Sequence, residues 1–243
     1  MVKVYENLKN NLTNFNSVIF NSNFKKWEEH INENIKERSP SGGNRYEKGI
    51  DKKIFNTCKK HYKKFKNTRN SENVMMVTHP FYLHLSHLYK RFSEKKEIKK
   101  QAKEYLDTLF YVFDLNNKKN KINIVALETV HHYAYLTSTL LEKGLINDII
   151  FTKYDSGAPL KTSRFDEFKK NRIFFAGGYN ERCLSNSIRQ AKEIIPYKNV
   201  FGIRELVLES PEFSNNLKTY DITGLETSKV IDLEIFLRDV ELL

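Results

Sequence analysis

The segment Gly177-Gly178-Tyr179-Asn180-Glu181-Arg182-Cys183 carries the most specific chemical signal in the sequence. It follows an apolar run, and its two glycines let the backbone turn tightly from a strand into a helix. Asn180 is a residue type favoured at a helix N-cap, which would make Cys183 the third helical residue. There the thiol would lie beside unpaired backbone N–H groups and the cation of Arg182, conditions that favour the nucleophilic thiolate. The segment therefore predicts a catalytic cysteine.

Two other interpretations of this segment stay open. Free cysteine often behaves as a small hydrophobic residue, so Cys183 could instead pack on the buried face of its helix. The backbone of Gly177, Gly178, Tyr179 and Asn180, with Arg182, could also cradle a phosphate or carboxylate without any cysteine chemistry.

Ionisable side chains also follow three other apolar runs. His79 follows residues 74–78, Glu128 and His131 follow residues 122–127, and Lys153 and Asp155 follow residues 149–152. We expect His79, Lys153 and Asp155 to perform acid–base and electrostatic work with Cys183, and Glu128 and His131 to contact substrate. His131 is also a candidate acid–base group, and Glu128 with His131 is a weaker candidate for a metal site.

The apolar runs that position these residues alternate with helical patterns. Strands are predicted near residues 74–78, 122–127, 149–152, 172–176 and 200–208, with amphipathic helices between them and a closing helix from Val230 to Val240. This alternation is typical of a three-layer, Rossmann-like α/β domain with a mostly parallel sheet and helices on both faces. In such a sheet the ligand crevice lies beyond the carboxyl ends of the strands, where the candidate residues fall.

The positive charge is concentrated in the first part of the chain. Residues 1–70 hold 16 of the 41 Lys and Arg but only 7 of the 30 Asp and Glu. We interpret residues 1–70 as a basic helical segment and residues 71–243 as the α/β domain. Clustered cations attract phosphates, so nucleic acid is a candidate partner of the basic segment; a general richness in lysine is the competing explanation.

Residues 177–191 resemble the nucleophile segment of the isochorismatase-like cysteine hydrolases. In that family a strand ends in Gly, Cys follows six positions later, Thr or Ser comes four after it, and Arg and Ala follow; Gly177, Cys183, Ser187, Arg189 and Ala191 match. The resemblance implies that Cys183 attacks an amide or related carbon, that Lys153 supports it and that nearby backbone N–H groups receive the oxyanion. The family has an Asp at the end of the first strand, where this chain has His79.

Length and composition restrict the class of protein and its cellular location. A chain of 243 residues with 40% hydrophobic and 29% charged residues can build a real core. Its two cysteines, the absence of a secretory signal and the lack of a long apolar run predict a cytoplasmic protein with free thiols and no membrane segment. The absence of GxGxxG and GxxxxGK[ST] strings weakens a dinucleotide or P-loop assignment, and the spacing of Glu128, His131 and His132 does not match the His-Glu-x-x-His zinc pattern, so we assign no metal or other cofactor.

Three functions follow from these observations. The first is a cysteine-dependent hydrolase or group transferase acting on a small-molecule substrate. The second is a nucleic-acid-associated α/β protein, and the third is a non-catalytic module that binds an anion or nucleotide. The sequence leaves a homo-oligomer open.

Overall fold

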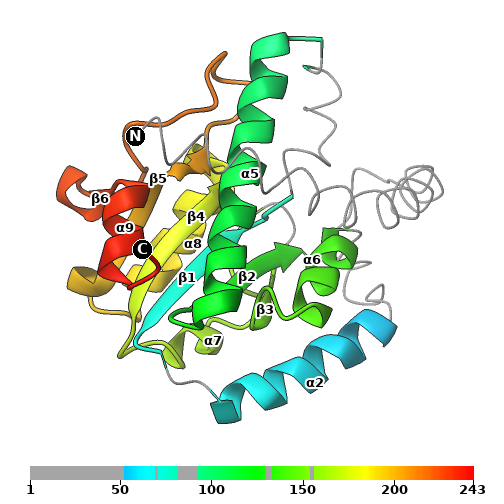
Figure 1. The fold of residues 1–243 in the computed structure, drawn as a ribbon. Helices are drawn as coiled ribbons and strands as arrows, with labels where there is room; N and C mark the ends of the chain where they lie inside the picture. The colour runs from blue at the N-terminus through cyan, green and yellow to red at the C-terminus, as the bar shows by residue number, and fades with distance from the viewer. Residues whose placement is uncertain (1–51, 69–70, 82–91, 93, 130–132, 154–155) are drawn as a thin grey trace.

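The computed structural model describes residues 52–68, 71–81, 92, 94–129, 133–153 and 156–243. Within them, one sheet of parallel strands has the order β3-β2-β1-β4-β5-β6 (Figure 1). The strands are β1 (Asn73–Thr78), β2 (Asn123–Thr129), β3 (Asp148–Thr152), β4 (Arg172–Gly178), β5 (Val200–Leu208) and β6 (Val230–Ile231). The α/β, Rossmann-like fold predicted from the alternation is therefore confirmed.

The strand order reverses between β1 and β4. Across this centre, Thr78 is in register with Leu127 of β2 on one side and with Gly177 of β4 on the other. The helices α5 (Lys96–Lys119) and α8 (Ser185–Lys192), which follow β1 and β4 in the sequence, contribute to the clusters on opposite faces of the sheet. The carboxyl ends of the strands at such a reversal are the place where open α/β sheets bind ligands.

Helices cover both faces of the sheet because side chains along each strand alternate between two buried clusters. Met75 and Val77 face the cluster that includes α5 (Lys96–Lys119) and α9 (Leu233–Asp239). Val74 and Met76 face the cluster that includes α7 (Ser163–Asp166) and α8 (Ser185–Lys192). Among the described helices, none is both long and apolar enough to cross a membrane.

The helix α2 (Lys52–Thr68) packs against β3 and against α6 (Tyr133–Glu142). Cys58 and Phe65 are buried on its inner side, and burial, followed by the charge of Asp148, raises the pKa of Cys58 to about 12. The basic segment thus contributes at least this helix to the α/β body (Figure 1), while residues 1–51 lie outside the described residues. The boundary at residue 70 stays a prediction.

One helix boundary differs from the expectation. The closing helix begins at Leu233 rather than Val230, because Val230 is in register with Gly202 as part of β6. A two-residue strand has no periodicity of its own, so the sequence pattern merged it with the helix that follows.

Candidate active site

The candidate catalytic residues meet where the strand order reverses. His79 directly follows β1, and Cys183 lies in the helical turn after β4. Gly177 brings these strand ends together: its φ is 101°, and a Cβ at this position would lie 2.0 Å from the Thr78 carbonyl oxygen. Only glycine permits both this backbone conformation and this approach.

Cys183 is enclosed at the start of the helical segment that precedes α8. It lies in the π-helical turn Asn180–Leu184, and only 2% of the residue is exposed. Gly157, in the loop after β3, adopts a φ of 65°, and a Cβ there would lie 1.9 Å from the Cys183 carbonyl oxygen. The loop after β3 therefore passes directly against the backbone of Cys183.

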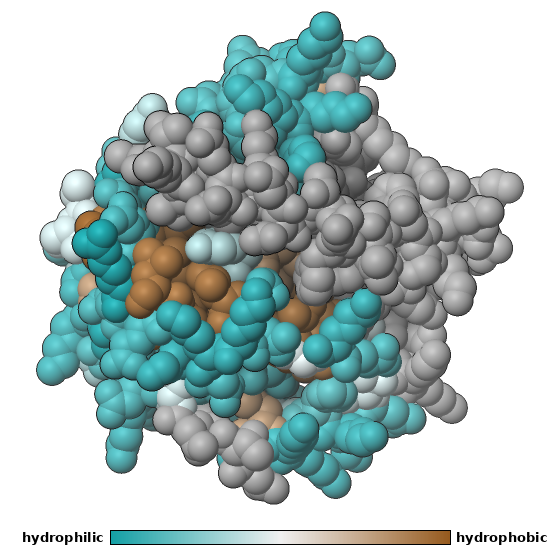
Figure 2. Space-filling view, in the orientation of Figure 1, coloured by the Kyte–Doolittle hydropathy of each residue, from teal (hydrophilic) through white to brown (hydrophobic). Residues whose placement is uncertain are grey.

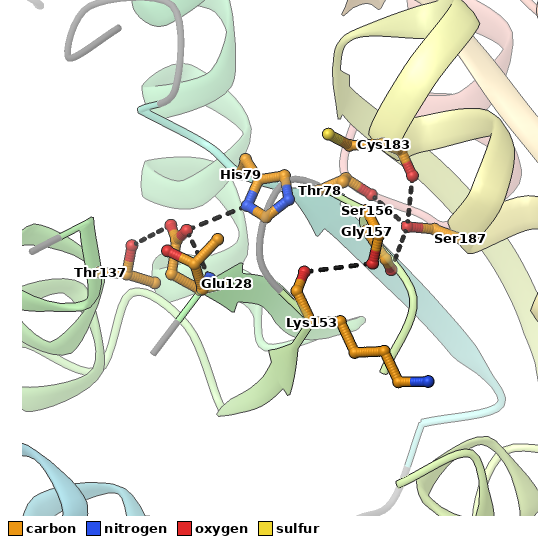
Figure 3. Close-up of polar contacts among 10 residues, drawn as sticks. Thr78, His79, Glu128, Thr137, Lys153, Ser156, Gly157, Cys183 and Ser187 are labelled. Atoms are coloured by element: carbon orange, nitrogen blue, oxygen red, sulfur yellow. Dashed lines mark hydrogen bonds and ion pairs between the residues drawn. The ribbon is translucent and has the colours of Figure 1, made fainter. Parts of the chain in front are cut away.

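Ser187 ties three segments together around this cysteine. Its Oγ lies 3.0 Å from the carbonyl oxygen of Cys183 and 2.8 Å from that of Gly157. The hydroxyl of Thr78, at the end of β1, donates to Ser187 Oγ at 3.2 Å (Figure 3). The backbone that carries Cys183 is thus held to both neighbouring strand ends by one buried hydroxyl.

His79 is fixed between Cys183 and a buried carboxylate. Its φ is 47°, and its backbone N–H donates to the Leu127 carbonyl at 2.8 Å. The ring Nδ1 lies 3.0 Å from Glu128 Oε1, and both side chains are fully buried (Figure 3). Cys183 also acts on this ring, since it is among the groups that raise the pKa of His79. The buried residues Cys183, His79 and Glu128 therefore lie together in one region.

Glu128 is itself held in place on both carboxylate oxygens. Oε1 accepts the backbone N–H of Thr129 at 2.9 Å as well as facing His79, and Oε2 accepts the Thr137 hydroxyl of α6 at 2.8 Å. Two neutral donors and the histidine ring thus satisfy a carboxylate that has no contact with solvent. The carboxylate is in a position to orient the ring and to fix which nitrogen faces the cysteine.

The surroundings make His79 a cation at neutral pH. Burial lowers the pKa of His79, but its interactions with Cys183 and with the carboxylate of Glu128 outweigh burial and raise the pKa to about 10. With both ring nitrogens protonated, one N–H points to the carboxylate and the other is available to the sulfur. A histidine held between a cysteine and a carboxylate is an arrangement that can activate a thiol.

The other predicted acid–base residues are placed differently. Lys153 directly follows β3, but its side chain is exposed and points away from His79 and Cys183 (Figure 3). Its backbone shapes the loop instead: its N–H donates to the Ala158 carbonyl at 2.8 Å, and its carbonyl accepts the N–H of Ser156 at 3.2 Å. Asp155 and His131 lie outside the described residues.

The predicted anion-binding residues of the loop after β4 have other partners. Arg182 is exposed and pairs with Glu212 at 2.5 Å. Asn180 is not a helix N-cap, since Tyr179 holds that position; its amide donates to Glu209 at 2.7 Å and to the Asp221 carbonyl at 2.8 Å. These hydrogen bonds from Asn180 hold the connection that follows β5 against the turn after β4.

Gly178 and Tyr179 of this loop have roles in packing. Tyr179 is completely buried, and its peptide bond with Gly178 is cis. Gly178 lies against β5, where an added Cβ would be 3.2 Å from Leu208 Cβ. Among the candidates of this loop, Cys183 is thus the one that faces His79.

A hollow of about 170 Å³ opens beside α5, close to the end of β5. Tyr105, Leu208 and Leu217 are among its lining residues, and Figure 2 shows apolar surface between the positions of α9 and α5. Burial, and then the charge of Glu128, raise the pKa of Tyr105 above its usual range. Neither Cys183 nor His79 lines this hollow, so it is separate from the reacting groups.

Two hydroxyl residues of the site were not predicted as functional from their types and spacing, Thr78 and Thr137. Thr137 lies within a stripe of otherwise apolar residues in a predicted helix. Its hydroxyl was the one feature of the sequence that could have pointed to a polar contact there. In the part of the chain that the structure describes, no three His, Cys, Asp or Glu side chains are grouped so as to hold a metal ion.

Comparison with known proteins adds no relative: no family model, no curated protein and no solved structure matches the chain.

Proposed function

We propose that the protein is a hydrolase or group transferase in which Cys183 is the nucleophile, His79 the acid–base group and Glu128 the residue that orients His79. The observation that carries this proposal is the burial of His79 3.0 Å from Glu128 and beside Cys183, at the reversal of strand order. A histidine with a raised pKa beside a thiol, at the place where open α/β sheets bind ligands, has a chemical use that packing does not require.

The reaction follows from the order of the three groups. The Cys183 thiolate attacks an electrophilic acyl carbon, and the carbonyl electron pair moves to oxygen, where backbone N–H groups near Cys183 receive it. The bond to the leaving group then breaks, and the leaving group takes a proton from His79. Neutral His79 next removes a proton from water or an acceptor alcohol or amine, whose attack breaks the C–S bond and restores the thiolate and the imidazolium.

The proposal keeps part of the isochorismatase-like resemblance and changes the rest. Attack by a cysteine on an amide or related carbon is shared with that family. The acid–base work is assigned to His79, which stands where the family has Asp, while Glu128 on β2 orients it and Lys153 is directed elsewhere. Because Cys183 is 2% exposed, we infer that the reacting end of the substrate is small and unbranched.

Alkylation of the native protein by iodoacetamide tests the nucleophile without a known substrate. The two cysteines are read separately by mass spectrometry after digestion. We expect Cys183 to react about tenfold or more faster than a free cysteine at pH 6, with little change from pH 6 to 8, because the imidazolium persists over this range. His79→Gln should abolish this excess reactivity at pH 6.

Cys58 is the internal control, since its thiol has a pKa of about 12 and should carry almost no thiolate between pH 6 and 8. If Cys183 reacts no faster than free cysteine at pH 6, or if His79→Gln leaves its rate unchanged, the ion pair is absent and the proposed function is wrong.

A further inference from the structure

The helix α2 carries positive charge without any compensating negative charge of its own. Its sequence contains no Asp or Glu. It contains seven lysines: Lys52, Lys53, Lys59, Lys60, Lys63, Lys64 and Lys66. Of these, Lys59, Lys63 and Lys66 are exposed and follow the spacing i, i+4, i+7, so they form one stripe on the helix, named here the lysine stripe.

The helix α5 shows that lysine richness alone does not produce such a face. Its exposed lysines are interleaved with carboxylates one turn away, and the pairs include Lys103 with Asp107 and Lys118 with Asp114. Like charges at i and i+4 destabilise a helix, whereas opposite charges stabilise it. The lysines of α5 named above therefore have carboxylate partners on their own helix, whereas the sequence of α2 contains no carboxylate. The repulsion between its lysines lowers the stability of α2.

Acidic side chains close to α2 in the described part of the chain already have a cationic partner. Arg164 pairs with Asp148 and, at 3.2 Å, with Glu167. The pKa of His61 is lowered, first by burial and then by the charges of Lys60 and Lys64, and the opposing effect of Glu142 is the smallest. The potential at this face is thus positive.

The inner side of α2 is already occupied, which restricts the kind of partner. Cys58 and Phe65 are buried in the protein, and Tyr62 lies under Arg164 and donates to Glu167 at 2.9 Å. The described part of the helix therefore offers no apolar face to insert into a bilayer. Among the described side chains of α2, the ring of Tyr62 is covered by Arg164 and that of Phe65 is buried, so neither is open for stacking of unpaired bases.

We propose that the lysine stripe of α2 binds the phosphates of double-helical nucleic acid without regard to sequence. A duplex carries one charge per about 1.7 Å of its axis, and the stripe spans about 10 Å, so each of its ammonium groups can meet a phosphate. Lysine ammonium groups are point charges that position a duplex and read no bases by themselves. This inference is independent of the proposed cysteine chemistry.

The test measures binding of the full chain to a 20-base-pair DNA duplex of arbitrary sequence between 50 and 200 mM salt. Each phosphate contact contributes about 0.9 to the slope of log affinity against log salt, so the three lysines should account for about 2.7 of that slope, a loss of about 40-fold over this range. The variant Lys59→Gln/Lys63→Gln/Lys66→Gln should lose this part of the slope.

The matched control is Lys100→Gln/Lys103→Gln/Lys118→Gln on α5, which removes the same net charge from lysines that have acidic neighbours. We expect the control to keep the slope of the parent, and thermal unfolding checks that both variants are folded at the temperature of the binding assay. Equal losses from the two variants, no binding by the parent, or binding of anionic phospholipid vesicles in preference to the duplex would each overturn the proposal.

Discussion

His79 is a cationic ring in a fully buried position, and Glu128 is the residue that makes this charge tolerable. The carboxylate lies 3.0 Å from Nδ1 and is held by Thr129 and Thr137 on its other sides. Leaving one member of a buried ion pair without its partner destabilises a protein by roughly 3–5 kcal/mol. The pair is therefore important for stability as well as for orientation of the ring.

The variant Glu128→Gln should show this in the dependence of stability on pH. The pKa of His79 is about 10 in the folded protein and 6.5 in the unfolded reference, so its stabilising contribution is complete below pH 6.5 and is lost as pH rises through 10. We expect the variant to be about 3 kcal/mol less stable than the parent at pH 6. Urea unfolding should show the difference shrinking towards pH 10.

The control for this variant is Glu234→Gln, which removes an exposed carboxylate paired with Arg238 at 2.5 Å. A surface pair contributes at most about 1 kcal/mol, and its loss should not follow the same pH trend. A deficit for Glu128→Gln that is equal at pH 6 and pH 10 would show that the carboxylate does not act through the charge of His79.

Individual site residues were predictable to different degrees. That Cys183 and His79 lie near each other was predictable, because strand ends in a parallel sheet share one edge and the glycines at the end of β4 indicated a turn. Glu128 was expected to contact substrate or to supply a supporting carboxylate, but its contact with His79 depends on which strands are neighbours and its second donor comes from α6. Lys153 was assigned from its place in the chain, but the direction of a long, flexible side chain at a strand end has no sequence signal.

Among the elements, the loop after β3 contributes to the site through its backbone. It brings Gly157 against the carbonyl of Cys183, and Ser187 joins the two. This contact is made by backbone atoms, so it restricts the residue type at position 157 to glycine. A single glycine is therefore the one trace of the contact in the sequence.

The variant Gly157→Ala should displace the turn that carries Cys183. The added Cβ would lie 1.9 Å from the Cys183 carbonyl oxygen and 2.8 Å from Ser187 Oγ, so one of these segments must move. We expect a loss of roughly 2–4 kcal/mol in the free energy of unfolding, from the left-handed backbone and the steric contact together. Alkylation of Cys183 should slow in parallel.

The residue for comparison is Gly144, whose φ is 71° but around which a Cβ would meet nothing within 4 Å. Gly144→Ala should cost only the roughly 1–2 kcal/mol of the backbone conformation and leave Cys183 reactivity unchanged. If the two variants behave alike, the contact between Gly157 and Cys183 has no effect on the cysteine.

The elements themselves followed from the sequence where they were long and regular. Buried strands of five or more apolar positions and amphipathic helices such as α5 carry clear periodic signals. The order β3-β2-β1-β4-β5-β6 does not, because it depends on the side of the sheet to which each crossover turns, and that choice is made by packing between distant residues.

At the scale of the whole molecule, several buried groups make the folded state hold protons more tightly. Burial, and then a hydrogen bond with Glu181, raise the pKa of Glu209 to about 7. Burial also raises the pKa of Asp148 to about 6 against the opposing charge of Arg164. For a carboxyl with a raised pKa the stabilising contribution is full at low pH and is lost as pH rises, the same direction as for His79.

The variant Glu209→Gln should therefore remove part of the decline in stability between pH 4.5 and 7. An amide resembles the protonated carboxyl and can still accept the hydrogen bond from Asn180. We expect the melting temperature of the variant to equal that of the parent near pH 5 and to exceed it at pH 8. The exposed Glu226→Gln should change neither value, and a variant less stable than the parent at pH 8 would contradict the assignment.

The residues of the candidate active site are far apart in the sequence, and this matters while the chain is synthesised on the ribosome. Thr78 and Ser187, which join across the crevice, are 109 positions apart. A nascent chain that has emerged only as far as β3 already holds the imidazole and its carboxylate but lacks the sulfur. The proposed reaction needs all three groups, so it predicts that the growing polypeptide is inert towards acyl compounds until β4 has paired with β1.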